Sequence, residues 1–256
     1  MSGDWIVPDW PAPPSVRALV TTRGGLDGGG SPVPTGPYGN FNLATHVGDD
    51  PLAVAANRQR LRLSLPGLPG DPLWLNQVHG SQVLTAENHR HGVESEADAC
   101  VARSPGLVCA VLSADCLPLL LCDANGGVVA GAHAGWRGLA AGVIEASVAA
   151  MRAEPADLLA WLGPAIGPGA FEVGDEVRAA FCRHDPRAAE AFVAHGPGKW
   201  LCDLYRLARQ RLATLGVRQV YGGDRCTFSE PQHFYSFRRD GVTGRMASLI
   251  WLERRE

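Results

Sequence analysis

The segment Ala110–Gly138, AVLSADCLPLLLCDANGGVVAGAHAGWRG, combines three short apolar runs with two side chains suited to catalysis. The runs are residues 107–112, 117–122 and 127–132, and the first of them begins three residues before the quoted segment. Each run is short and is bounded by turn-forming residues, a pattern that predicts buried strands. Cys116 lies between the first two runs, and His133 directly follows the third in a loop flanked by glycine. We therefore expect both side chains at the ends of strands, where connecting loops stay accessible.

The rest of the chain carries helical and strand patterns in similar number. Apolar residues at helical spacing predict helices at residues 51–63, 139–152, 173–184, 186–194 and 204–215. Further strands are predicted at residues 16–22, 73–80, 81–85, 97–102, 158–162, 217–221, 234–237 and 246–251. The two kinds do not alternate regularly, which favours an α+β fold with mostly adjacent or antiparallel strands over a doubly wound sheet. Because no repeat or linker interrupts residues 1–256, we expect a single domain.

The charge and composition exclude several classes of partner and reaction. A formal net charge of −3 and an isoelectric point near 6.2 give no basic surface for nucleic acid or anionic membranes. Lys199 is the only lysine, and the residues around it do not form a phosphate-binding Walker A loop. No GxSxG, GxGxxG or HxE motif is present, so the signatures of α/β-hydrolases, Rossmann dehydrogenases and cytidine deaminases are missing.

The cysteine pattern indicates reduced thiols. The chain holds seven cysteines, an odd number, with no CxxC pair and no ordered disulfide framework. The first residues lack the basic and apolar regions of a secretion signal, and no apolar run approaches the length of a membrane span. We therefore expect a cytoplasmic protein that is not associated with membranes.

Two histidines and one cysteine are predicted where strands meet turns: His79, Cys116 and His133. Neutral imidazole and thiolate are ligands that zinc prefers, and three protein ligands leave a fourth position for water or substrate. A second interpretation uses the same residues without metal, with Cys116 as nucleophile, a histidine as base and Asp115 as the group that orients it. Asp115 is equally suited to capping a turn. The pattern of residues alone leaves these interpretations open.

Four arginines lie beside glycines or at strand ends: Arg23, Arg137, Arg238 and Arg239. The planar guanidinium group suits phosphate and carboxylate, so a subset of these side chains is a candidate anion site. The alternative for each of them is a solvated side chain or a structural ion pair.

Five ordered motifs resemble the YfiH family, which is also called the laccase-domain or multicopper polyphenol oxidase-like family, or the peptidoglycan editing factors. The motifs are Asn76–Gly80 (NQVHG), Ser113–Pro118 (SADCLP), His133–Gly138 (HAGWRG), Gly163–Pro168 (GPAIGP) and Tyr235–Gly241 (YSFRRDG). The resemblance extends from Pro8 to Trp251, which is effectively the whole chain.

The resemblance implies a single domain of mixed β-sheets flanked by helices. It also implies that His79, Cys116 and His133 are the metal ligands and take part in catalysis, with zinc as the cofactor and copper as the alternative metal. The substrate pocket that it implies includes five polar side chains, which are Arg23, Asn42, Gln77, Arg137 and Arg238.

The activity that the resemblance implies is purine nucleoside chemistry. It comprises phosphorolysis of adenosine, inosine and methylthioadenosine to the base and the sugar 1-phosphate, together with deamination of adenosine. One alternative is a cysteine or metal hydrolase that edits peptidoglycan precursors, and another is a non-catalytic module that senses a metabolite. A copper-dependent polyphenol oxidase activity is expected at most as a side reaction, because a single centre of two histidines and one cysteine cannot store four electrons. The expected partners are a purine nucleoside and phosphate, and the sequence leaves the oligomeric state open.

Overall fold

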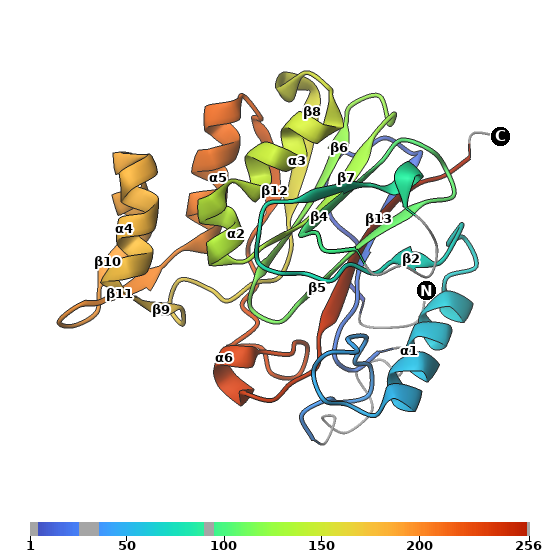
Figure 1. The fold of residues 1–256 in the computed structure, drawn as a ribbon, viewed down its shortest axis with the longest axis horizontal. Coiled ribbons are helices and arrows are strands. Elements are labelled where there is room, and N and C mark those ends of the chain that lie inside the picture. The colour runs from blue at the N-terminus through green and yellow to red at the C-terminus, as the bar shows by residue number, and fades with distance from the viewer. Residues whose placement is uncertain (1–4, 26–35, 90–94, 255–256) are drawn as a thin grey trace.

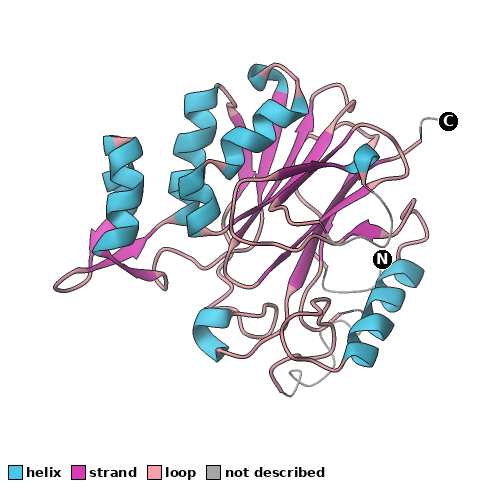
Figure 2. Ribbon diagram, in the orientation of Figure 1, coloured by secondary structure: helices cyan, strands magenta, loops and turns pink. Residues whose placement is uncertain are grey.

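The elements of the chain stack in four layers, with two β-sheets between two layers of helices (Figure 1). The computed structural model describes residues 5–25, 36–89 and 95–254. Figure 2 shows helices on the two outer sides and most of the strands between them. This arrangement confirms the predicted α+β fold of mixed β-sheets flanked by helices.

Three sheets account for the strands of the described residues. The first has the order β1-β13-β5-β2 and consists of Val16–Val20, Met246–Leu252, Val108–Ser113 and Pro72–Leu73. The second has the order β12-β8-β6-β7-β4-β3 and consists of Gln219–Gly222, Leu158–Leu162, Leu117–Asp123, Val129–Ala134, Ala99–Ala102 and Val83–Thr85. A small third sheet, β10-β11-β9, consists of Phe192–Ala194, Lys199–Cys202 and Glu172–Gly174. Most neighbours are antiparallel, as expected, and β12 with β8, β2 with β5 and β3 with β4 are parallel.

Helices cover the outer faces of the two large sheets. The α-helices of the described residues are α1 (Pro51–Ser64), α2 (Trp136–Ala141), α3 (Val143–Met151), α4 (Asp175–His184), α5 (Leu204–Leu215) and α6 (Phe237–Asp240). Short 3-10 helices are η2 (Ala86–Asn88), η3 (Pro155–Asp157) and η4 (Pro186–Ala191). Helix α1 covers the first sheet, α2, α3 and α5 cover the second, and α4 packs beside the small third sheet (Figure 1). None of the helices in the described part of the chain is long and apolar enough to cross a bilayer.

The apolar runs of the central segment are continuous because both faces of their strands are buried. In β5, Ala110 and Leu112 face the cluster under α1, whereas Cys109 faces the second sheet. In β6, Leu119 packs under the helices, and Leu120 packs between the sheets. Strands buried on both faces need no polar side chain at alternate positions, so their sequences lack the period-two pattern of an exposed sheet.

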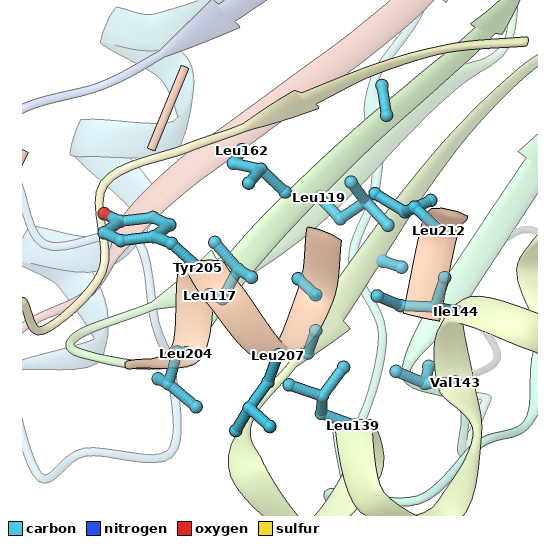
Figure 3. Close-up of a cluster of buried hydrophobic side chains, with 14 of the residues drawn as sticks. Leu117, Leu119, Leu139, Val143, Ile144, Leu162, Leu204, Tyr205, Leu207 and Leu212 are labelled. Carbon is cyan, nitrogen blue, oxygen red and sulfur yellow. The ribbon is translucent and has the colours of Figure 1, made fainter. Parts of the chain in front are cut away.

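Helix α5 confirms the clearest helix prediction. Asp203 accepts a hydrogen bond from the backbone N–H of Arg206 at the start of the helix, and Gly216 ends it with φ of 94°. Its leucines enter the largest apolar cluster, and Figure 3 shows Leu207 and Leu212 beside residues of α2, α3 and β6. The cluster holds the second sheet against its helices.

Three predicted helices have different bounds in the structure. The helix predicted at residues 139–152 is divided into α2 and α3 by Gly142, whose φ is 96°. Glycine adopts this left-handed conformation at little cost, so the chain changes direction there. Residues 173–174 and 192–194, at the ends of the other two predicted helices, belong to strands β9 and β10 instead, because both strands pair with β11. Strand β9 is distant from β11 in the sequence, so this pairing leaves no signal near residues 173–174, whereas β10 and β11 form a hairpin around residues 195–198.

Two predicted strands are wrong. In residues 73–80 the ladder ends at Leu73, apart from an isolated bridge at Asn76. The side-chain amide of Gln77 makes the bonds to β5 that a strand backbone would make. It accepts a hydrogen bond from the backbone N–H of Leu112 at 2.7 Å and donates one to the backbone carbonyl of Leu112 at 2.8 Å. Residues 234–237 form no strand because Ser236 accepts a hydrogen bond from the N–H of Arg239 and begins helix α6.

Candidate metal centre

Three side chains that can bind a metal lie together at one end of the two large sheets. His79 comes from the loop before β3, Cys116 from the connection between β5 and β6, and His133 from β7. Their ligand atoms all lie within 4.8 Å of one another. Nε2 of His79 is 3.9 Å from Sγ of Cys116, and the two imidazole rings meet edge to face with centroids 4.8 Å apart. The three residues predicted as metal ligands therefore share one site.

Strand pairing sets the positions of Cys116 and His133. Strand β5 belongs to the first sheet and β6 to the second, so residues 114–116 cross between the sheets. In the antiparallel register Pro118 pairs with His133, which puts Cys116 opposite Gly135. His133 lies within β7 and is 3% exposed, which corrects the expectation that it follows the strand in a loop.

Asp98 connects the two histidines, although no motif in the sequence pointed to it. Its carboxylate is fully buried. Oδ1 accepts hydrogen bonds from Nδ1 of His133 and from the backbone N–H of His79, both at 2.9 Å. Oδ2 accepts from the N–H groups of Val78 at 3.2 Å and Gly80 at 2.6 Å. One carboxylate thus orients the His133 ring, which leaves Nε2 as its ligand atom, and also holds the turn that carries His79. The available signal was an acidic residue inside a predicted buried strand.

Two residues of the site have strained backbones. His79 has φ of 59° and Asp115 has φ of 87°, a left-handed conformation that is uncommon for residues with side chains. The carboxylate of Asp115 accepts from the hydroxyl of Thr227 at 2.6 Å and from the N–H of Arg238 at 2.7 Å. Both of its oxygens therefore bond away from the histidines, and the triad interpretation with Asp115 as the orienting group is wrong. Its role is to hold the loop, which agrees with the capping alternative.

The charges of the site favour a thiolate beside a protonated histidine in the metal-free protein. Burial alone would raise the pKa of the Cys116 thiol, but the charges and hydrogen bonds of His133 and His79 outweigh it and lower the pKa to about 6. Burial opposes protonation of His133, whereas Cys116 and Asp98 together raise its pKa to about 9. Burial also opposes ionisation of Asp98, and hydrogen bonds from His133 and Gly80 still hold its pKa below the usual range. At neutral pH the cluster therefore contains the thiolate that metal binding requires.

The donor set and the space around it fit a borderline-soft divalent metal. One thiolate and two imidazoles are typical of catalytic zinc sites, and a histidine that bonds a carboxylate through its other nitrogen is typical of metal ligands. A Cβ at Gly135 would lie 2.9 Å from Sγ of Cys116 and 3.0 Å from Cδ2 of His79. The gap between these two side chains therefore depends on glycine. Copper takes the same ligand types, so the donor set also accommodates it.

The substitution Gly135→Ala is expected to weaken zinc binding about tenfold or more, because the added methyl group displaces Cys116 or His79. Zinc affinity is measured by competition with a chromogenic chelator. Gly169→Ala is the control, since a Cβ there meets no atom within 4 Å. A folded Gly135→Ala protein with the affinity of the parent would show that the cluster tolerates the methyl group and would contradict the prediction.

Three of the predicted pocket residues bond mainly to the protein itself. Asn42 is fully buried, and its amide bonds the carboxylate of Asp49 and the backbone of Ala44. Gln77 bonds the backbone of β5, as described above. Arg23 is 7% exposed and donates to two backbone carbonyls. The amides of Asn42 and Gln77 therefore have partners within the protein, whereas Nε of Arg23 is buried with no hydrogen-bond partner among the described residues.

The other two predicted pocket residues, Arg137 and Arg238, are exposed. Arg137 lies in the first turn of helix α2, which follows β7, and its guanidinium is 4.4 Å from the ring centroid of Trp136. The guanidinium of Arg238 donates to the backbone carbonyl of Glu172 at 2.7 Å, and the backbone N–H of Arg238 donates to the carboxylate of Asp115. Arg239, in contrast, donates to three backbone carbonyls and to the carboxylate of Asp240. These bonds give Arg239 the structural role that was the alternative to anion binding.

Comparisons with known proteins agree with the motifs. Residues 17–253 match the family described as multi-copper polyphenol oxidoreductase laccase. The chain is 53% identical over 247 residues to a protein of Escherichia coli (strain K12) named purine nucleoside phosphorylase YfiH, with 96% of this chain and 98% of the relative covered. A Pseudomonas aeruginosa protein, also named purine nucleoside phosphorylase, is 52% identical over 250 residues, with 97% and 98% covered.

Structural comparison gives the same result. A crystal structure of a Neisseria meningitidis protein matches with a TM-score of 0.90 and 49% sequence identity, covering 98% of this chain and 100% of that one. The YlmD protein of Geobacillus stearothermophilus matches with a TM-score of 0.82 and 30% identity, with 94% and 93% covered. From its motifs, its sequence match and its fold, the chain belongs to the multi-copper polyphenol oxidoreductase laccase family, the family of the YfiH proteins.

Proposed function

We propose that this protein is a zinc-dependent purine nucleoside phosphorylase. Its substrates would be adenosine, inosine and methylthioadenosine together with phosphate, and it would also deaminate adenosine to inosine. The observation that carries the proposal is the cluster of His79, Cys116 and His133, held by Asp98, in a chain 53% identical to a relative named purine nucleoside phosphorylase.

The residues of the chain have separate tasks in this proposal. Zinc, when bound, would supply a Lewis acid and a water molecule whose pKa is lowered to about 7. Asp98 keeps the His133 ring in one orientation, so that Nε2 remains a ligand atom. The exposed guanidinium groups of Arg137 and Arg238 would contribute to binding the phosphate. Phosphate would then be the nucleophile, and the bond between sugar and base would break through a transition state with oxocarbenium character.

One alternative function has an observation in its favour. The thiolate of Cys116 beside the protonated His133 is also the active form of a nucleophilic cysteine. A cysteine hydrolase acting on peptidoglycan precursors would use this pair without metal. Polyphenol oxidation is less suited to the site, because the described residues contain one group of three such ligands and a multicopper centre needs more.

The cellular setting forms part of the proposal. We place the protein in the cytoplasm as a single domain over residues 1–256 that acts on small molecules. The net charge of −3 supports the choice of small-molecule partners, since it offers no attraction for nucleic acid or for anionic membranes.

The proposal is tested by the products formed from adenosine. Zinc-loaded protein is incubated with adenosine in phosphate buffer and in phosphate-free buffer, and the products are separated by chromatography. Adenine and ribose 1-phosphate that form only with phosphate would show phosphorolysis, and inosine would show deamination. Protein stripped with a chelator and then reloaded controls for the metal. Unchanged adenosine, combined with cleavage of a muramyl peptide by metal-free protein, would instead support the cysteine hydrolase.

A further inference from the structure

The ring of Phe237 is exposed on a segment that is tied to the metal centre. Phe237 begins helix α6 and is 59% exposed. The next residue, Arg238, donates its N–H to Oδ2 of Asp115 at 2.7 Å, and Asp115 directly precedes Cys116. Because Thr227 fixes the other oxygen of the same carboxylate at 2.6 Å, the start of α6 has a defined position relative to Cys116. A large ring held there in solvent is suited to stacking on a planar ligand.

The guanidinium of Arg245 lies over the same ring, so a ligand would stack on the other face. Its Cζ is 5.9 Å from the ring centroid of Phe237. Arg245 directly precedes β13, where Met246 pairs with Ser113, the last residue of β5 before the loop of Cys116. Arg245 therefore lies across from the start of that loop. Burial lowers its pKa, and the negative charges of Cys116 and Asp115 oppose this change, so the cation interacts with both groups.

Arg245 is a half-buried cation with no carboxylate bonded to it among the described residues. Its Nη1 donates to the carbonyls of Thr243 at 2.8 Å and Gly244 at 3.0 Å, which leaves Nε and Nη2 available. Arg211 shows the usual arrangement, since its buried guanidinium bonds the carboxylate of Glu145 at 2.6 Å. A charge withdrawn from water without an anion is costly. The position of Arg245 thus favours an anionic ligand.

We propose that Phe237 and Arg245 form the nucleoside and phosphate subsites beside the metal centre. The purine base stacks on the exposed ring, and Nε and Nη2 of Arg245 bind the phosphate that attacks the sugar. The separation of 5.9 Å between ring and guanidinium keeps the two ligands adjacent, as a reaction between them requires. This inference rests on the proposed phosphorylase function and names the side chains that select its two substrates.

The stacking subsite is tested with Phe237→Ala and Phe237→Trp. We expect Phe237→Ala to raise KM for adenosine about tenfold or more, because base stacking on an aromatic side chain is lost. KM for phosphate and the zinc content should stay at the parent values, and Phe237→Trp should retain the affinity for adenosine. Val242→Ala is the control, since it removes another exposed apolar side chain, 56% exposed, from the same segment. A Phe237→Ala enzyme with an unchanged KM for adenosine would overturn this subsite.

The phosphate subsite is tested with Arg245→Gln and Arg245→Lys. We expect Arg245→Gln to raise KM for phosphate about tenfold or more and to change KM for adenosine little, because a charge-assisted contact is lost. Lysine should restore part of the affinity, which a purely structural role would not predict. Arg17→Gln, at a surface ion pair with Glu253, is the matched control. If zinc-loaded Arg245→Gln protein has the same KM for phosphate as the parent, the assignment of Arg245 to the phosphate subsite is overturned.

Direct binding separates failure of the subsites from failure of the phosphorylase function. Adenosine is titrated into the parent and into Phe237→Ala protein by calorimetry without phosphate. Weaker binding to the variant supports the stacking subsite even if the parent has no turnover. Phosphorolysis by the parent with equal adenosine binding by both proteins leaves the function intact and overturns the subsite. Absence of adenosine binding by the parent overturns both.

Discussion

The Cys116→Ala variant is expected to lose its zinc and to lose phosphorolysis and deamination together, by more than about 100-fold. Cys116 supplies the only thiolate of the cluster, and two imidazoles alone hold zinc weakly. The measurements are the zinc content of the purified protein and the rates of adenine and inosine formation. Cys182→Ala is the control, because Cys182 is a half-buried free thiol on α4, outside the cluster.

The same variant distinguishes a ligand from a nucleophile. If Cys116→Ala protein keeps its zinc but has no activity, the thiolate is the nucleophile and the metal assignment fails. The pH dependence gives a second measurement. Since the pKa of Cys116 is lowered to about 6, the thiolate absorbance of metal-free parent protein should persist above that pH and disappear as the pH falls through it. Cys116→Ala protein should show no such transition.

The Asp98→Asn variant is expected to bind zinc about 10- to 100-fold more weakly and to unfold more easily by about 1–3 kcal/mol. Asparagine replaces one acceptor oxygen by an NH2 group, whereas both oxygens of Asp98 accept two hydrogen bonds each. Either orientation of the amide would therefore face N–H donors, and the turn of His79 or the ring of His133 would shift. Chelator competition and denaturant unfolding measure the two effects.

Asp123→Asn is a matched control for Asp98→Asn. Asp123 is also buried, at 8% exposure, and also accepts hydrogen bonds from three backbone N–H groups, but it contacts neither histidine. Its substitution should lower stability and leave zinc affinity unchanged. If both variants lose stability equally and both keep the zinc affinity of the parent, Asp98 is a structural carboxylate and the positioning role is wrong.

The sequence predicted those features whose causes lie within a few residues of one another. Asp203 and Gly216 mark the two ends of α5, and the apolar runs around Cys116 predicted β5 and β6. Each of these elements depends on local capping or on burial of a short run, which the composition of that run reveals. The three candidate ligands were also found in this way, because each is near a predicted strand end.

The tertiary structure alone decided how these parts act on one another. Asp98 is separated from His133 by 35 positions, and only the pairing of β4 with β7 makes them partners. The side chain of Gln77 bonds the backbone of Leu112, which is also 35 positions away, where the sequence predicted that a strand would continue. Asp115 bonds Thr227, 112 positions away, instead of a histidine.

The sequence by itself therefore determined the candidate ligands and most of the elements that carry them. The structure decided which carboxylate orients His133 and where Arg245 lies relative to Cys116. The physical reason is that hydrogen bonds and ion pairs depend on distance in space, and strand register sets that distance with no signal in the neighbouring residues.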